Sequence, residues 1–187
     1  MSSPDSAPAE VQLTPTGKVI LGMLGLGIST GYDVKNFVDK TTRHFWAASY
    51  GQIYPELRRL EEQGLVSGRP EPTGGRARTV YNLTDAGRSA LLRWLQSDAE
   101  TVNEARDEGM LKLFFSDAGG PAERIENIRS MRARDERTLA QLRSLEPHAA
   151  AGPKGPYLTL QLGIALHEAA VNWCEAAERE LEKEEKE

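Results

Sequence analysis

The sequence is poor in the residues from which disulfides, metal sites and many active sites are built. It contains one cysteine and three histidines in 187 residues. Cys174 cannot form a disulfide within the chain, which favours a reducing compartment. His44, His148 and His167 are far apart in sequence, and neither a CxxC or HxxxH spacing nor a glycine-rich nucleotide-binding motif occurs. These absences predict a protein that is not an enzyme and that holds no metal or cofactor.

Long apolar runs are also missing. No stretch approaches the ~20 apolar residues needed to cross a bilayer, because Lys18, Asp33 and Lys35 flank the most apolar early segment. Residues 1–12 are small, polar and acidic, and they lack the basic start and apolar run of a secretory signal. The sequence therefore predicts a cytoplasmic protein with a flexible N-terminal tail.

Charge is divided unevenly along the chain. The net charge is −5, but residues 13–97 carry 11 Lys or Arg against 7 Asp or Glu, whereas residues 98–187 carry 12 against 19. A local basic face matters more for phosphate binding than the total charge. We expect the N-terminal part to meet nucleic acid and the acidic C-terminal part to meet protein.

Two short helices are predicted near the N-terminus. The first is signalled by Thr14 or Thr16 as the N-cap and the second by Ser29 or Thr30. The residues expected to face the core are Val19, Ile20, Met23 and Leu24 in the first helix, Tyr32, Val34, Phe37 and Val38 in the second, and Phe45 and Trp46 in the turn that follows.

A third helix is predicted from Ser49, which has the capping-box spacing to Gln52, as far as Gly64. Ile53, Leu57 and Leu60 form its core stripe. Gly51, Pro55 and Arg58 lie opposite, flanked by Tyr54 and Arg59. A proline inside a helix costs up to ~3 kcal/mol, so Pro55 on the exposed face points to function.

Two short strands follow, at residues 65–67 and 79–83, and a loop rich in Gly, Pro and Arg separates them. Arg69, Arg76 and Arg78 sit on or beside that loop, while Tyr81 and Leu83 are expected to be core strand residues. Thr84 caps a fourth helix, whose expected apolar residues are Ala86, Leu91, Leu92, Trp94 and Leu95.

The C-terminal half is predicted to be helical. Residues 98–108 form a linker or the end of the fourth helix, and an apolar segment occupies residues 110–115. A helix is predicted over residues 121–145, and Arg132, Arg134 and Asp135 interrupt its apolar positions at the centre. Residues 147–156 form a loop, and the last helix covers 157 to about 183. The fold class is mainly α: a winged helix-turn-helix with a two-stranded β-hairpin wing over residues 13–97, and a helical dimerisation domain over 109–183, with tails at 1–12 and 184–187.

The strings SYGQIYPELRRLEEQGLV and GGRARTVYNLTDAGRSAL resemble the PadR family of bacterial transcriptional regulators. The segments GYD, MLKLFF and YLTLQLGIALHEAAVNW are similar to the second helix and the C-terminal dimerisation helices of its longer members, so the resemblance covers about residues 13–181. It implies a homodimeric repressor bound to a palindromic operator on double-stranded DNA. In some members a small phenolic or hydrophobic effector releases the repressor.

Specific residues follow for each role. The DNA-binding candidates are Ser49, Tyr50, Gln52, Tyr54, Pro55, Arg58 and Arg59 on the third helix, and Arg76 and Arg78 on the wing. The dimerisation candidates are Leu160, Ile164, Val171 and Trp173. Trp94 and Trp173 either line an effector pocket or belong to a buried dimer interface, and the interface is favoured.

Two points stay open. Tyr54 either packs against the wing or touches DNA. The winged helix can also serve as a protein-interaction module without specific DNA binding, since a fold alone does not fix a function.

Overall fold

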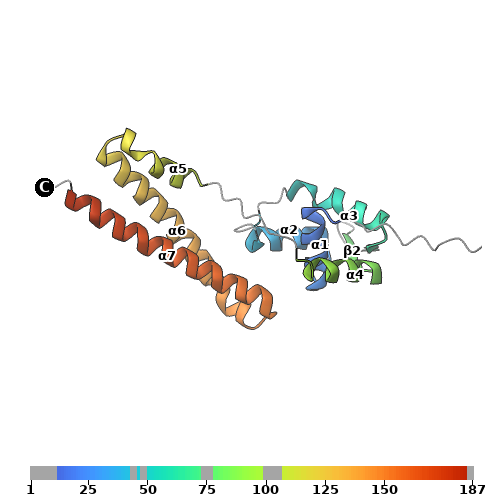
Figure 1. The fold of residues 1–187 in the computed structure, drawn as a ribbon. Helices are drawn as coiled ribbons and strands as arrows, with labels where there is room; N and C mark the ends of the chain where they lie inside the picture. The colour runs from blue at the N-terminus through green and yellow to red at the C-terminus, as the bar shows by residue number, and fades with distance from the viewer. Residues whose placement is uncertain (1–11, 43–45, 47–49, 73–77, 99–106, 185–187) are drawn as a thin grey trace, which may run out of the picture. The chain divides into compact units, whose positions relative to one another are not determined.

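The structure is a computed structural model that describes residues 12–42, 46, 50–72, 78–98 and 107–184. The chain divides into two compact units, residues 1–100 and 101–187 (Figure 1). The first contains four α-helices and a β-hairpin, and the second contains three α-helices among its described residues. None of the helices in the described ranges has the length and apolar character needed to span a membrane.

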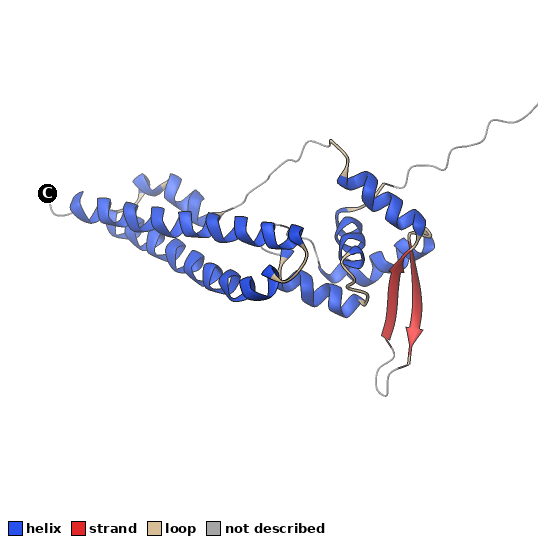
Figure 2. Cartoon of the chain, turned by 90° about the horizontal axis from the view of Figure 1, so that it is seen from below, coloured by secondary structure: helices blue, strands red, loops and turns tan. Residues whose placement is uncertain are grey.

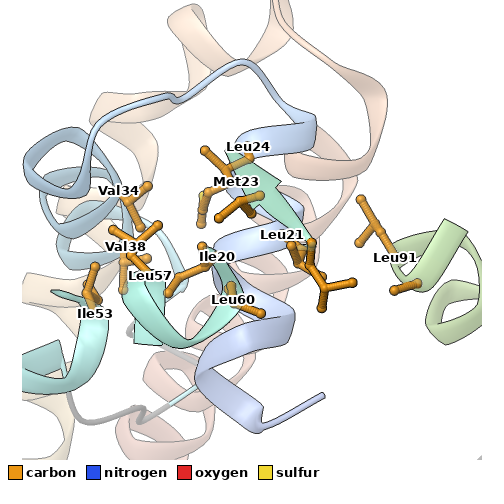
Figure 3. Close-up of a cluster of buried hydrophobic side chains, with 13 residues drawn as sticks. Ile20, Leu21, Met23, Leu24, Val34, Val38, Ile53, Leu57, Leu60 and Leu91 are labelled. Carbon is orange, nitrogen blue, oxygen red and sulfur yellow. The ribbon is translucent and has the colours of Figure 1, made fainter. Parts of the chain in front are cut away.

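Three helices build the core of the first unit. They are α1 (Pro15–Gly25), α2 (Gly31–Lys40) and α3 (Ile53–Glu62). Thr14 and Thr30 cap α1 and α2 by accepting hydrogen bonds from the backbone N–H groups of Gly17 and Asp33. The apolar side chains of the three helices meet in one cluster around Ile20, Leu57 and Leu60, and these three side chains have no exposed surface (Figure 3).

The wing is an antiparallel hairpin of β1 (Val66–Glu71) and β2 (Arg78–Leu83), drawn in red in Figure 2. Its register pairs Val66 with Leu83, and Tyr81 and Leu83 pack against the core as predicted. The helix α4 (Asp85–Leu95) follows, capped by Thr84. Here β1 is longer than expected, because Arg69 and Pro70 lie in the strand rather than in the loop. Proline is tolerated there because both strands of a two-stranded sheet are edges.

The start of α3 differs from the prediction. A 3₁₀ turn (Tyr50–Gln52) precedes it, α3 begins at Ile53, and Gln52 makes no side-chain cap hydrogen bond. Ser49 lies outside the described residues. Pro55 is therefore in the first turn, where a backbone N–H has no partner within the helix, so the expected cost of an interior proline does not arise.

Several side chains predicted for the core are exposed instead. Those with large exposed fractions are Tyr32 (65%), Trp46 (39%), Leu92 (50%) and Leu95 (64%), and Ala86 is also exposed. Short helices bury only a narrow stripe, which here is filled by Val34 and Val38 in α2 and by Ala90 and Leu91 in α4. Phe45 lies outside the described residues.

The second unit is a helical hairpin with a short helix against it. The hairpin pairs α6 (Pro121–Ala150) with α7 (Lys154–Glu184), and α5 (Glu108–Phe114), followed by a 3₁₀ turn (Ser116–Ala118), packs on α6. Ile128 and Met131 contact the cluster around Cys174, and Leu139 and Leu142 contact Ile164.

The loop predicted for this hairpin is wrong. The helix α6 continues through Pro147 to Ala150, and α7 starts at Lys154, so the predicted ten-residue loop is mostly helix. Pro147 is tolerated because it lies in the exposed last turn, where the carbonyl that loses its partner can be hydrated. Asp135 interrupts the apolar row of α6 as predicted, but it is buried in that row, 5% exposed, and its Oδ1 is 2.7 Å from Nδ1 of His167.

Candidate nucleic-acid interface

The outward face of α3 is largely exposed in the described part of the first unit. Ile53 and Leu57 point into the core, and this leaves Tyr54, Pro55 and Arg58 on the exposed side, with Tyr54 51% exposed. Gly51 and Gln52 of the 3₁₀ turn are exposed as well. The structure thus brings Gln52, Tyr54, Pro55 and Arg58 together at the start of one helix, and Tyr50 belongs to the same turn.

Arg59 is held differently from Arg58. Its Nε and Nη2 atoms donate to Oε2 and Oε1 of Glu56 at 3.0 and 2.9 Å, and Thr14 Oγ1 donates to the same Oε1 at 2.5 Å. Burial raises the pKa of Glu56, but the hydrogen bonds from Arg59 and Thr14 outweigh it and hold the pKa below 4.5. A Cβ at Gly17 would lie 2.8 Å from Oε1, so glycine leaves room for this carboxylate. Arg59 therefore belongs to a network that joins α3 to the start of α1.

Sequence reasoning missed Glu56, although a signal was present. Glu56 is three residues after Ile53 and one before Leu57, so helical spacing places it on the inward face, where it is 9% exposed.

The cations of the wing are spread along the hairpin. Arg69 is exposed in β1. Arg78 starts β2, and its Nη2 lies 2.6 Å from Oε2 of Glu71, its register partner across the hairpin. Arg76 falls outside the described residues. The exposed pair Arg78–Glu71 leaves the arginine open to solvent, with its side chain 54% exposed.

The base of the wing is tied to the helices on both edges. The backbone N–H of Gly68 donates to Oε1 of Glu61 on α3 at 2.8 Å. Its register partner Tyr81 donates its own N–H to the carbonyl of Ser29 at 2.7 Å. Desolvation raises the pKa of Tyr81, and the nearby Glu61 carboxylate raises it further while Arg58 opposes the shift. Arg58 and Glu61 of α3 are thus close enough to Tyr81 of the wing for their charges to act on its hydroxyl group.

Tyr54 and Trp94 have neighbours that sequence alone did not indicate. A Cβ at Gly31 would come within 2.7 Å of the Tyr54 ring, so the ring packs on the start of α2. Trp94 is half-buried against the core, and the ammonium of Lys18 lies 5.7 Å from the centre of its ring.

In the second unit, two of the residues predicted for dimerisation are used within the chain. Leu160 and Ile164 pack against Leu139 and Leu142 of α6, because these positions face the inside of the hairpin. Val171 is half-buried and Trp173 is 50% exposed.

The exposed apolar residues of α7 form a separate row. Leu158, Leu162 and Leu166 follow one another at four-residue spacing with exposed fractions of 56%, 60% and 61%, and Trp173 lies two turns further on. Trp173 was expected at an interface, but the three leucines were not identified, because apolarity alone does not show which face of α7 meets α6.

Two family models match the chain, one in each unit. Residues 20–93 match the transcriptional regulator PadR-like family. Residues 105–182 match the family described as virulence activator alpha C-term. The first match contains α3 and the wing, and the second contains α5, α6 and all but the last two residues of α7.

Known proteins show the same similarity over most of the chain. The negative transcriptional regulator PadR of Bacillus subtilis is 29% identical over 175 residues, which cover 88% of this chain and 96% of that protein. The crystal structure of Bacillus subtilis PadR in complex with operator DNA has a TM-score of 0.78 at 28% identity and covers 88% of this chain and 97% of its own. The same protein in complex with p-coumaric acid has a TM-score of 0.74 at 27% identity, with 90% and 99% covered.

Proposed function

The chain belongs to the PadR-like family of transcriptional regulators, and on this premise we propose that it is a homodimeric repressor that binds a palindromic operator through α3 and the wing. Its relatives are DNA-binding regulators and not enzymes. The observation that carries the proposal is the exposed face of α3, where Tyr54, Pro55 and Arg58 stand beside a hairpin that carries exposed arginines.

In this proposal the start of α3 enters the major groove, which admits a helix and displays a distinct donor and acceptor pattern for each base pair. Gln52 and Tyr54 reach base edges, and Arg58 reaches a phosphate or a guanine edge. Arg78 meets the DNA backbone from the wing. Ser49, Tyr50, Pro55, Arg59 and Arg76 remain sequence-based candidates for the same interface.

A single winged helix supplies modest affinity, so a second half-site requires dimerisation. We assign DNA binding to residues 13–97, dimerisation to residues 109–183, and the role of linker to residues 98–108. The exposed row Leu158, Leu162, Leu166 and Trp173 on α7 supports this assignment, since contiguous exposed apolar residues mark interaction surfaces.

A small phenolic or hydrophobic compound is proposed to release the repressor, with Trp94 and Trp173 as candidate ligand contacts. The complex of the Bacillus subtilis relative with p-coumaric acid supports this idea. A cytoplasmic location follows from the proposed action on DNA.

Selection of bound fragments from a random duplex pool at ~0.15 M salt tests the proposal, because much of the unspecific electrostatic binding is screened there. We expect enrichment of a palindrome whose half-sites are about one helical turn, ~10 bp, or a simple multiple apart. A pool that stays unenriched would favour a protein-interaction module instead.

A further inference from the structure

The position of the wing is fixed in part by a hydrogen bond from its backbone to a side chain of α3. An isolated two-stranded hairpin is marginally stable in water, so its position depends on contacts with the rest of the domain. Gly68 and Tyr81 face each other across the hairpin, and each turns its backbone N–H away from the partner strand. The Gly68 N–H, on the outer edge of β1, is taken by the Glu61 carboxylate at 2.8 Å.

The fit around Gly68 is close. A Cβ at this position would lie 2.8 Å from Oε1 of Glu61, 2.9 Å from the Tyr81 ring and 3.1 Å from the Thr79 methyl group. Real Cβ atoms essentially never come within 3.0 Å of another atom, so any side chain at Gly68 would displace Glu61, Tyr81 or the strand. The glycine thus allows the helix side chain to reach the strand backbone.

The two edges of the hairpin are held by different kinds of group. On the β2 edge, the chain before α2 supplies the Ser29 carbonyl, and Thr30 forms an isolated bridge with Val80. On the β1 edge, the acceptor is a side chain of α3, the helix that carries the proposed base-reading residues. Among the described residues, Glu61 is thus the α3 side chain that hydrogen-bonds directly to a strand of the wing.

We propose that Glu61 is a positioning residue for DNA binding. By accepting the hydrogen bond from Gly68 it fixes the position of the wing, and so sets where Arg69 and Arg78, further out on the hairpin, meet the DNA backbone. This inference rests on the proposed DNA binding of α3 and the wing. Glu61 itself is an anion beside a polyanion, so its charge alone opposes binding. Any benefit of Glu61 to DNA affinity must therefore come from the position it gives the wing. Removal of its negative charge alone would strengthen binding, whereas loss of the positioning contact would weaken it.

Glu61→Ala tests it, with Glu62→Ala as the matched control. Both residues are exposed on α3, and both changes remove one negative charge, but Glu62 makes no hydrogen bond or ion pair with the described residues. Glu61→Gln keeps a carbonyl oxygen that can accept from Gly68 and serves as the conservative variant. Binding of the full-length variants to a mixed-sequence duplex of about 30 bp, long enough for two half-sites, is measured from ~0.05 to ~0.2 M salt.

We expect Glu61→Ala to weaken binding by about tenfold, the effect of losing one charge-assisted contact, and to reduce the salt slope by about one per domain. Glu62→Ala should bind as well as the wild type or better, and Glu61→Gln should stay within about twofold of it, while all three keep the helical circular dichroism of the wild type. In a background with Arg69→Ala and Arg78→Ala, the added loss from Glu61→Ala should fall below about twofold, because the contacts it positions are already gone.

If Glu61→Ala and Glu62→Ala had equal affinity for the duplex and equal salt slopes, the inference would be overturned, although DNA binding by the wild type would stand. A full tenfold loss that persists in the arginine-free background would overturn it too, because Glu61 would then act through something other than the wing. Absence of salt-dependent binding by the wild type would overturn the proposed function, and with it the inference.

Discussion

Thr14 and Glu56 are 42 positions apart, yet their side chains share a hydrogen bond of 2.5 Å between the start of α1 and the first turn of α3. The same hydroxyl oxygen accepts the N–H of Gly17 and so caps α1. One threonine thus accepts a hydrogen bond from an otherwise unpaired backbone N–H at the start of α1 and donates one to the carboxylate that binds Arg59. This contact ties α3 to the rest of the domain by polar as well as apolar groups.

Removing the Thr14 hydroxyl is therefore expected to lower the free energy of unfolding by more than the loss of an ordinary N-cap residue does. Thr14→Ala loses the N-cap acceptor and the donor to a partly buried carboxylate, which together lower the free energy of unfolding by about 2 kcal/mol. Thr14→Ser keeps both hydrogen bonds and should lose much less. Urea unfolding followed by circular dichroism measures the difference, and equal stabilities for Ala and Ser would show that the contact contributes nothing.

The stability contribution of Glu56 should depend on pH. Because its pKa is lower in the folded chain than the ordinary value of 4.5, its contribution is complete above that value and is lost as the pH falls through the lower folded-state pKa. Wild type and Glu56→Gln should therefore differ most near neutral pH, and their unfolding free energies should converge in acid. A difference that grows on acidification would contradict this assignment.

Arg58 and Arg59 are neighbours with different expected roles. Arg58→Ala should weaken operator binding by about tenfold and change the unfolding free energy by less than ~0.5 kcal/mol, because Arg58 is exposed. Arg59→Ala should lower stability by about 1–2 kcal/mol, since it leaves the Glu56 carboxylate short of hydrogen bonds. Binding titrations and denaturant unfolding on the same samples separate the two effects.

The double variant Tyr54→Ala with Arg58→Ala tests the role of α3 itself. If this variant left operator binding intact, α3 would not be the recognition helix.

Helical periodicity was enough to identify the core of α3. Ile53, Leu57 and Leu60 were predicted from their spacing alone and are all fully buried or nearly so. Periodicity was less reliable for α2 and α4, where Tyr32 and Leu92 are apolar but exposed. In a short helix the apolar residues span a wider arc than the core covers, and only tertiary packing selects among them.

The polar contacts of the candidate site could not be predicted in the same way. The Glu61–Gly68 hydrogen bond depends on the register of β1 against β2, and Thr14–Glu56 depends on how α1 crosses α3. Asp135 interrupts the apolar pattern of its own helix, and the partner that accompanies its burial, His167, lies on another helix 32 positions away. Long-range pairing of this kind leaves no local pattern in a single sequence.

Two glycines of the first unit should respond oppositely to alanine. At Gly87 a Cβ would lie 1.9 Å from the carbonyl oxygen of Leu65, so Gly87→Ala must move α4 away from the chain that leads into β1. We expect a loss of about 3 kcal/mol or more. Gly22, inside α1, has open space at that position, and Gly22→Ala should stabilise the domain by roughly 0.5–1 kcal/mol. Thermal unfolding of both variants checks the pair, and a harmless Gly87→Ala would mean that α4 packs less closely than described.

The row of exposed leucines on α7 gives the sharpest test of dimerisation. Leu162 is 60% exposed within its own chain, so Leu162→Glu should leave the hairpin folded, while a charge buried in an apolar interface would dissociate the dimer at micromolar concentration. Gln141→Glu, an added charge at an exposed position of α6, is the control. Sedimentation equilibrium should give the monomer mass for Leu162→Glu and twice that mass for the control. Because a monomer contacts one half-site, Leu162→Glu should also lose operator affinity far more than it loses affinity for an isolated half-site. A variant that remains dimeric would place the contact on another surface, and Leu160 and Ile164 cannot supply it while they fill the inside of the hairpin.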